Sequence, residues 1–151
     1  MLLTLRDHLR NCLPHLSGDW VNGKKKYDLP FALAIGATYE DKRHWDCIWD
    51  GMHIELKMGK LWFNLVRYSE RLLKTTPEAC VEVITLCMSY SNNRITNIYA
   101  VRSNKLIEAL RLSEQSALDL IRIKGELPRD LNAQASLSIV DIRSIAEFHV
   151  R

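Results

Sequence analysis

The 151-residue chain lacks several features that mark common classes of protein. Its four cysteines are dispersed and form no C-x-x-C pair, so buried reduced thiols are expected and no zinc site or iron–sulfur cluster is indicated. No apolar stretch reaches the roughly 20 residues that a transmembrane helix needs. The first residues, MLLTLRDHLRNCLPHL, are too charged and their apolar run is too short for a signal peptide. We therefore expect a soluble, cytoplasmic protein that does not bind membranes.

A strong excess of charge is also missing. The chain has 21 basic and 18 acidic residues, a formal net charge of +3, so only local basic clusters can indicate a nucleic-acid partner. Apolar residues make up 47% and charged residues 26%, which is ordinary for a globular protein. The length predicts one domain, 1–151, large enough to bury a core, and no repeat or low-complexity segment divides it.

Hydrophobic periodicity and turn residues predict a mixture of helices and strands. Helices are expected over 3–16, 61–74, 104–112 with Ser103 as its cap, and 113–123, with a short helix or strand after Pro30. Strands are expected on both sides of Asp50-Gly51, on both sides of SNNR (91–94), and at SLSIVDI (136–142); residues 39–43 and 125–132 are expected to be loops. The predicted fold class is α/β (α+β), a central mixed β-sheet flanked by helices.

Residues 44–60, HWDCIWDGMHIELKMGK, predict a β-hairpin. Asp50-Gly51 suits a two-residue type I′ turn, because both central positions of that turn need positive φ. Counting outward from the turn places Asp46 opposite Glu55. Alternation then gives an apolar face of Trp45, Cys47, Trp49, Met52, Ile54, Leu56 and Met58, and a polar face of His44, Asp46, Ile48, His53, Glu55 and Lys57.

The polar face carries the residue types of metal-assisted hydrolysis. Directly opposed residues have Cβ atoms about 4.5–5.5 Å apart, so the carboxylates of Asp46 and Glu55 would repel each other unless a cation lay between them. Mg²⁺, with Mn²⁺ as a substitute, prefers such oxygen ligands. Lys57 would reach a metal-bound water or a phosphate oxygen, which predicts phosphodiester hydrolysis with Asp46, Glu55 and Lys57 as catalytic residues. An exposed face with a Lys–Glu pair and a solvated aspartate is the alternative.

The motif of Asp46 followed by Glu55-Leu56-Lys57 resembles that of the PD-(D/E)xK nuclease superfamily, in particular the small PvuII-like type II restriction endonucleases. The resemblance implies a restriction-endonuclease-like core, a catalytic hairpin at 44–58, and a helical region at 1–38 that forms a homodimer. It further implies Mg²⁺-dependent, site-specific cleavage of double-stranded DNA. Trp45 stands where the motif has a proline. A second E-x-K triplet, Glu40-Asp41-Lys42, lies in a charged loop in which apolar and polar residues do not alternate, so it is not interpreted as the nuclease motif.

DNA contacts are predicted from polar and basic clusters near the hairpin. The candidates for phosphate contacts are Lys24, Lys25, Lys26, Lys42, Arg43 and His44. Asn92, Asn93 and Arg94 have side chains able to contact base edges in the major groove, although the same residues also make a good turn.

Three alternatives remain open. A repair nuclease or junction resolvase of the same superfamily would use the same hairpin, and a non-catalytic DNA-binding module would keep the fold without the reaction. A third reading, raised by His44 and His53 on one face, is an iron site formed by His44, Asp46 and a distant histidine, which would be His149, His15 or His8. The metal requirement separates this last reading from the nucleases.

Overall fold

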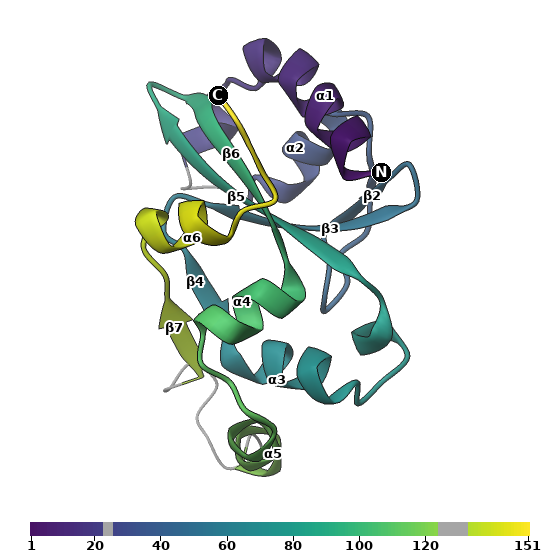
Figure 1. Ribbon diagram of the computed structural model, residues 1–151. Coiled ribbons are helices and arrows are strands. Elements are labelled where there is room, and N and C mark those ends of the chain that lie inside the picture. Colours follow the sequence, from purple (N-terminus) through teal and green to yellow (C-terminus); the bar gives the residue numbers. More distant parts are fainter. Residues whose placement is uncertain (23–25, 124–132) are drawn as a thin grey trace.

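The computed structural model describes residues 1–22, 26–123 and 133–151, which form a six-stranded sheet between two groups of helices (Figure 1). The helices are α1 (Leu2–Cys12), α2 (Asp28–Ala34), α3 (Leu65–Leu73), α4 (Ser103–Ala109), α5 (Glu114–Ile123) and α6 (Ile139–Ile145). The strands are β1 (Thr38–Tyr39), β2 (Cys47–Trp49), β3 (Met52–Met58), β4 (Trp62–Asn64), β5 (Val83–Ser91), β6 (Arg94–Arg102), β7 (Gln134–Ser136) and β8 (Phe148–Val150). The predicted α+β class with a central mixed sheet is confirmed.

The strand order of the sheet is β1-β2-β3-β5-β6-β8. Only β3 and β5 run parallel; the other neighbouring strands are antiparallel. A parallel pair needs a crossover connection, and the segment with β4 and α3 supplies it. This crossover brings α3 close to the residues of β3. The strands β4 and β7 pair with each other in a separate ladder.

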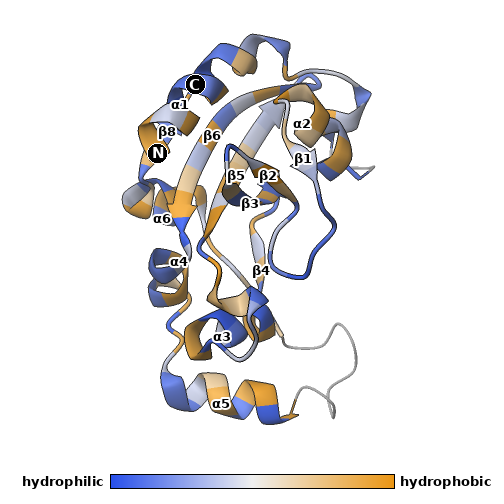
Figure 2. Ribbon diagram, turned by 90° about the vertical axis from the view of Figure 1, so that its right-hand side faces the viewer, coloured by the Kyte–Doolittle hydropathy of each residue, from blue (hydrophilic) through white to orange (hydrophobic). Residues whose placement is uncertain are grey.

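Apolar side chains pack on both faces of the sheet. On one face, alternate residues of β3 (Ile54, Leu56 and Met58) join a core with residues of α1 and α2. On the other face, a second core contains Phe63, Tyr68, Tyr99, Leu106 and Ile142, from β4, α3, β6, α4 and α6. The loop between β1 and β2 is strongly hydrophilic and lies outside both cores (Figure 2).

Three predicted elements differ from the structure. The helix expected from residue 61 begins at Leu65. Asn64 caps it by accepting a hydrogen bond from the backbone N–H of Arg67, and residues 62–64 pair with β7 as strand β4. Ser103 is not the cap of α4, since its hydroxyl donates to the carbonyl of Val83. The strand expected at SLSIVDI is wrong: a capping box formed by Ser138 and Asp141 starts α6 there.

Other predicted elements are confirmed. The helices expected at 3–16 and 113–123 form as α1, which ends at Cys12, and α5; the segment at Pro30, which could be helix or strand, is helix α2 and begins at Asp28. Strands β5 and β6 form the hairpin around Asn92 and Asn93. The strands β1 and β8 were not predicted. The loop expected at 125–132 lies outside the described residues. Within the described residues, no helix combines the length and apolar character needed to span a bilayer.

Candidate active site

The hairpin predicted at 44–58 forms with the predicted turn. Asp50 and Gly51 have φ values of 49° and 77°, as a type I′ turn requires. From this turn, Trp49 pairs with Met52, Ile48 with His53 and Cys47 with Ile54. The apolar face is buried at Cys47 and from Met52 to Met58, with Trp49 half-buried, so the predicted division of the hairpin into two faces is confirmed over β3.

The predicted direct pairing of Asp46 with Glu55 is not formed. The backbone N–H of Asp46 donates to the carbonyl of Ile54 at 2.8 Å, although Ile54 already pairs with Cys47. Asp46 and Cys47 thus both lie opposite Ile54. This is the geometry of a β-bulge, which changes the direction of the chain. Trp45 therefore leaves the apolar face, and its ring lies edge-on against His53 with ring centroids 4.6 Å apart.

Side chains complete the edge of β3 where β2 ends. The Asp46 Oδ2 accepts a hydrogen bond from the backbone N–H of Leu56 at 2.7 Å. The Tyr27 hydroxyl accepts from the N–H of Met58 at 3.2 Å and donates to the carbonyl of Leu56 at 3.3 Å. Because Tyr27 directly precedes α2, this contact also brings Asp28 to the same edge of the sheet.

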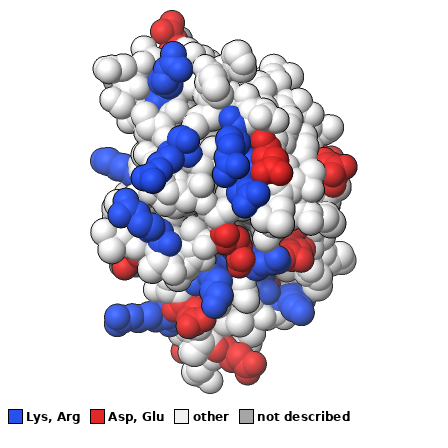
Figure 3. Space-filling view, turned by 45° about the horizontal axis from the view of Figure 1, so that its top comes forward, with Lys and Arg blue, Asp and Glu red and all other residues white. Residues whose placement is uncertain are grey.

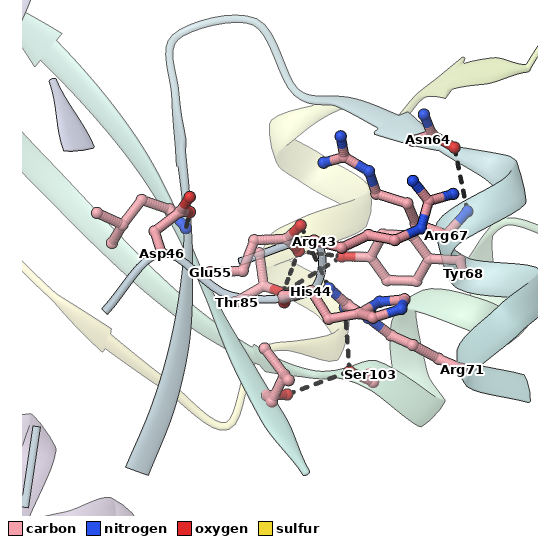
Figure 4. Close-up of polar contacts among 12 residues, drawn as sticks. Arg43, His44, Asp46, Glu55, Asn64, Arg67, Tyr68, Arg71, Thr85 and Ser103 are labelled. Carbon is pink, nitrogen blue, oxygen red and sulfur yellow. Dashed lines mark hydrogen bonds and ion pairs between the residues drawn. The ribbon is translucent and has the colours of Figure 1, made fainter. Parts of the chain in front are cut away.

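Glu55 lies in a buried polar network on the opposite side of β3, below α3 (Figure 4). Its Oε1 accepts hydrogen bonds from the hydroxyl groups of Tyr68 and Thr85, and its Oε2 lies 3.4 Å from Nη2 of Arg71. Burial would raise the pKa of Glu55, but Arg71, Lys57 and the two hydroxyl groups outweigh it and hold the pKa below its ordinary value. Glu55 is therefore ionised and paired.

Arg71 also fixes the loop that precedes the hairpin. Its guanidinium donates to the carbonyl of His44 at 2.6 Å and to Nδ1 of the same residue at 3.1 Å. His44 is only 1% exposed, and its Nε2 lies 3.3 Å from Oε1 of Glu70. Arg43 forms a bidentate ion pair with Glu70, with N–O distances of 2.7 and 3.0 Å. The predicted DNA contact by His44 is therefore corrected, because this side chain has no exposed surface for it.

Asp46 also has a perturbed carboxylate. Burial, then repulsion from Asp28 and Glu55, raises its pKa to about 7, although the Leu56 N–H and Lys57 act in the opposite direction. Burial, followed by the charge of Asp41, likewise raises the pKa of Asp28. A raised pKa means that the ionised form of a carboxylate is unfavourable in its surroundings. A nearby cation would stabilise that ionised form.

Lys57 lies among these carboxylates. Its charge lowers the pKa of Asp28, Asp46 and Glu55, and its ammonium lies 5.5 Å from the centroid of the Phe63 ring. Lys57 thus acts electrostatically on both predicted acids, Asp46 and Glu55, and the catalytic roles of the three residues stay a prediction.

The acidic side chains of the site fit a divalent cation in part. Asp28 and Asp46 provide hard oxygen atoms, which Mg²⁺ prefers, in a region of negative charge. Glu55 fits less directly, because Arg71, Tyr68 and Thr85 already occupy its two oxygens. In the described parts of the chain, no three His, Cys, Asp or Glu side chains are grouped as a metal site. Asp46, with Asp28, therefore fits the role of metal ligand, and Glu55 would have to exchange Arg71 for the ion.

The other predicted DNA contacts are separated from one another. Lys26 is exposed near Asp28, and the Lys42 ammonium lies 4.0 Å from Glu78, whereas Lys24 and Lys25 lie outside the described residues. Asn92 and Asn93 form the exposed turn of the β5–β6 hairpin, roughly 20 Å along the strand from the partner of Glu55. The carbonyl of Asn93 and the Arg94 side chain bind the N-terminal segment, at Gly18 and Pro14.

Several residues of the site were missed. Arg71, Glu70 and Arg67 looked like the solvent-facing side of an amphipathic helix, yet Arg71 and Glu70 are buried and the Arg67 Nε is buried without a hydrogen-bond partner in the described part of the chain. Thr85 contacts Glu55 only through the parallel register of β3 and β5. A buried arginine in a helix has no local sequence signal, so only the tertiary structure identifies it.

A scan against models of protein families finds no match to this chain, and a search of curated protein sequences also finds none.

Proposed function

We propose that this protein is a Mg²⁺-dependent endodeoxyribonuclease that hydrolyses phosphodiester bonds in double-stranded DNA. The observation that carries the proposal is the pKa of Asp46, raised to about 7 by burial and by Asp28 and Glu55, beside the ammonium of Lys57. Perturbed carboxylates next to a lysine are characteristic of functional sites, because a structural site would normally avoid such repulsion. The motif resemblance to PD-(D/E)xK nucleases supports the same reaction.

Each residue has a role that follows from its position. Asp46 and Asp28 would hold the cation, which supplies an activated water and shields the phosphate charge. Lys57 would position the attacking water and stabilise the negative charge that develops on the phosphate oxygens. Glu55 holds Arg71 and sets the local charge, and its carboxylate would help to hold the cation if Arg71 paired with the phosphate instead.

The finer features belong to the same proposal. Site-specific cleavage, a restriction-endonuclease-like core and a homodimer formed through residues 1–38 follow from the family resemblance. Two-fold symmetry would place two active sites on the two strands of a palindrome. Lys26 and Lys42 are exposed and suit phosphate contacts, whereas the charge of Arg43 is already paired with Glu70.

The test is cation-dependent cleavage of supercoiled plasmid by the purified chain, with Mg²⁺ or with EDTA. Discrete bands are expected with Mg²⁺, and Lys57→Ala should lower the rate by about two to three orders of magnitude. Lys60→Ala is the matched control, because Lys60 is exposed just beyond the same strand. Plasmid that stays intact with Mg²⁺, or a Lys57→Ala protein that cleaves at the wild-type rate, would contradict the proposal.

A DNA-binding module without catalysis is the second candidate. Both oxygens of Glu55 are already bound by Tyr68, Thr85 and Arg71, and a network of this kind also occurs in proteins as a structural ion pair without catalytic function. This observation favours a role without catalysis. Duplex binding without cleavage in the same assay would select this function.

A further inference from the structure

A polar recess lies on the sheet face that carries Glu55 and Lys57, at the opposite edge of the sheet. It has a volume of about 450 Å³ and is bounded by β5, β6, β8 and α6. The described residues that line it include no acidic side chain; they are Ser89, Asn97, Tyr99, Ile139, Arg143, His149 and Arg151. Two guanidinium groups, a histidine, an amide and a hydroxyl therefore face the same space.

The floor of this recess is held by neighbouring strands. The Asn97 side-chain N–H donates to Oγ of Ser89 at 2.9 Å, and its Oδ1 lies 2.7 Å from Nε2 of His149. The His149 ring stacks on the Tyr99 ring, with centroids 4.1 Å apart and an interplanar angle of 16°. These contacts fix the polar groups before any ligand binds, which lowers the entropy lost on binding.

The arginines of the recess differ from Arg71 and Arg102 in having no carboxylate partner within the part of the chain that the structure describes. Arg71 and Arg102 lie within 4.0 Å of carboxylates, at Glu55, Glu82 and Glu147. Among the described residues, no carboxylate lies within that distance of Arg143 or Arg151. The positive charge of the recess is therefore not neutralised internally. Figure 3 shows basic side chains gathered with few acidic ones on the side of the molecule where α6 lies.

We propose that this recess, the Arg143 pocket, binds a phosphate group. Guanidinium groups form paired hydrogen bonds with phosphate oxygens, and the Ser89 hydroxyl lies at the floor, where the Asn97 amide holds it by donating to its oxygen. The volume also accommodates the organic group to which a phosphate is attached. The proposal does not depend on cleavage at Asp46.

The location gives two sources for this phosphate. Lys57, Cys87, Tyr99 and His149 are successive partners across the sheet, so His149 lies three strand spacings, roughly 14 Å, from Lys57 on one face. The second core covers Cys87 and Tyr99 between them, so a nucleic-acid strand would have to pass over the outside of this core to place a backbone phosphate in the Arg143 pocket. A free phosphorylated small molecule, such as a nucleoside monophosphate, would present the same chemistry.

The experiment uses the full chain in EDTA, so that no cleavage occurs. Inorganic phosphate and a nucleoside monophosphate are titrated at constant ionic strength while the amide resonances of Ser89, Asn97 and His149 are followed by NMR. A labelled DNA duplex is titrated in parallel by fluorescence anisotropy. Arg143→Ala is compared with Arg122→Ala. Arg122 is an exposed arginine on α5, so its replacement removes the same charge at a position away from the recess.

Saturable shifts at the recess are expected, with affinity about tenfold lower in Arg143→Ala and unchanged in Arg122→Ala. If duplex affinity also falls and inorganic phosphate competes with the duplex, the source is nucleic acid. If duplex affinity is unchanged while the nucleoside monophosphate loses affinity, the source is a small molecule. Absence of saturable shifts in the wild-type protein, or equal phosphate affinity in Arg143→Ala, would overturn the proposal. Arg143 is exposed, so its replacement should not impair folding, which circular dichroism verifies.

Discussion

Replacing Asp46 by asparagine is expected to stabilise the metal-free protein at pH 8. An asparagine keeps an oxygen that can accept the hydrogen bond from the Leu56 N–H, but it removes the charge that burial, Asp28 and Glu55 disfavour. The pKa of about 7 lies roughly three pH units above the ordinary value of 3.8. Each unit corresponds to about 1.4 kcal/mol, so ionised Asp46 costs at most about 4 kcal/mol of folding free energy. Local rearrangement and water reduce this, and we expect a gain of about 2–4 kcal/mol.

The gain must depend on pH in a defined direction. Below about pH 3, Asp46 is largely protonated in both the folded and the unfolded chain, so its ionisation costs little. Between pH 4 and 7 the unfolded chain ionises first and the cost increases; above pH 7 the cost is complete. Urea unfolding in EDTA at pH 4, 6 and 8 measures the difference between Asp46→Asn and wild type, which should increase with pH.

The matched control is Asp50→Asn, at an exposed turn position of the same hairpin where positive φ suits asparagine. Its effect should stay within about 0.5 kcal/mol at each pH. Adding Mg²⁺ at pH 8 should stabilise the wild type but not Asp46→Asn, because only the wild type keeps the charged ligand. An Asp46→Asn protein less stable than the wild type, or a difference that does not change with pH, would refute the reasoning.

Two further predictions concern buried pairing and helix capping. Arg71→Ala should lower the free energy of unfolding by about 3–5 kcal/mol, because Glu55 then stays buried without its cation; Arg43→Ala, whose side chain is 47% exposed, should cost less. Urea unfolding measures both, and equal losses would contradict the difference in burial. Ser138→Ala should cost about 1 kcal/mol and lower the melting temperature, because α6 loses its cap, whereas exposed Ser136→Ala serves as control. An unchanged melting temperature for Ser138→Ala would show that the capping box does not contribute.

The hairpins could be predicted because their signals are local. Asp50-Gly51 permits the positive φ of a tight turn, and the alternation on each side assigns Ile54 and Glu55 to opposite faces. The segment SLSIVDI misled because a seven-residue run fits both periods, and the capping signal of Ser138 and Asp141 was the stronger one.

The sequence by itself determined the residue types and the hairpin that presents Glu55 and Lys57, since both depend on neighbours within a few positions. Only the tertiary structure decided how the acids are arranged. The bulge that turns Asp46 toward the Leu56 N–H, and the contact between Arg71 and Glu55, join segments 10 and 16 positions apart through a sheet edge and a crossover helix. Such contacts depend on where β2 ends and how α3 packs, and these are set by the whole core and not by any short stretch of sequence.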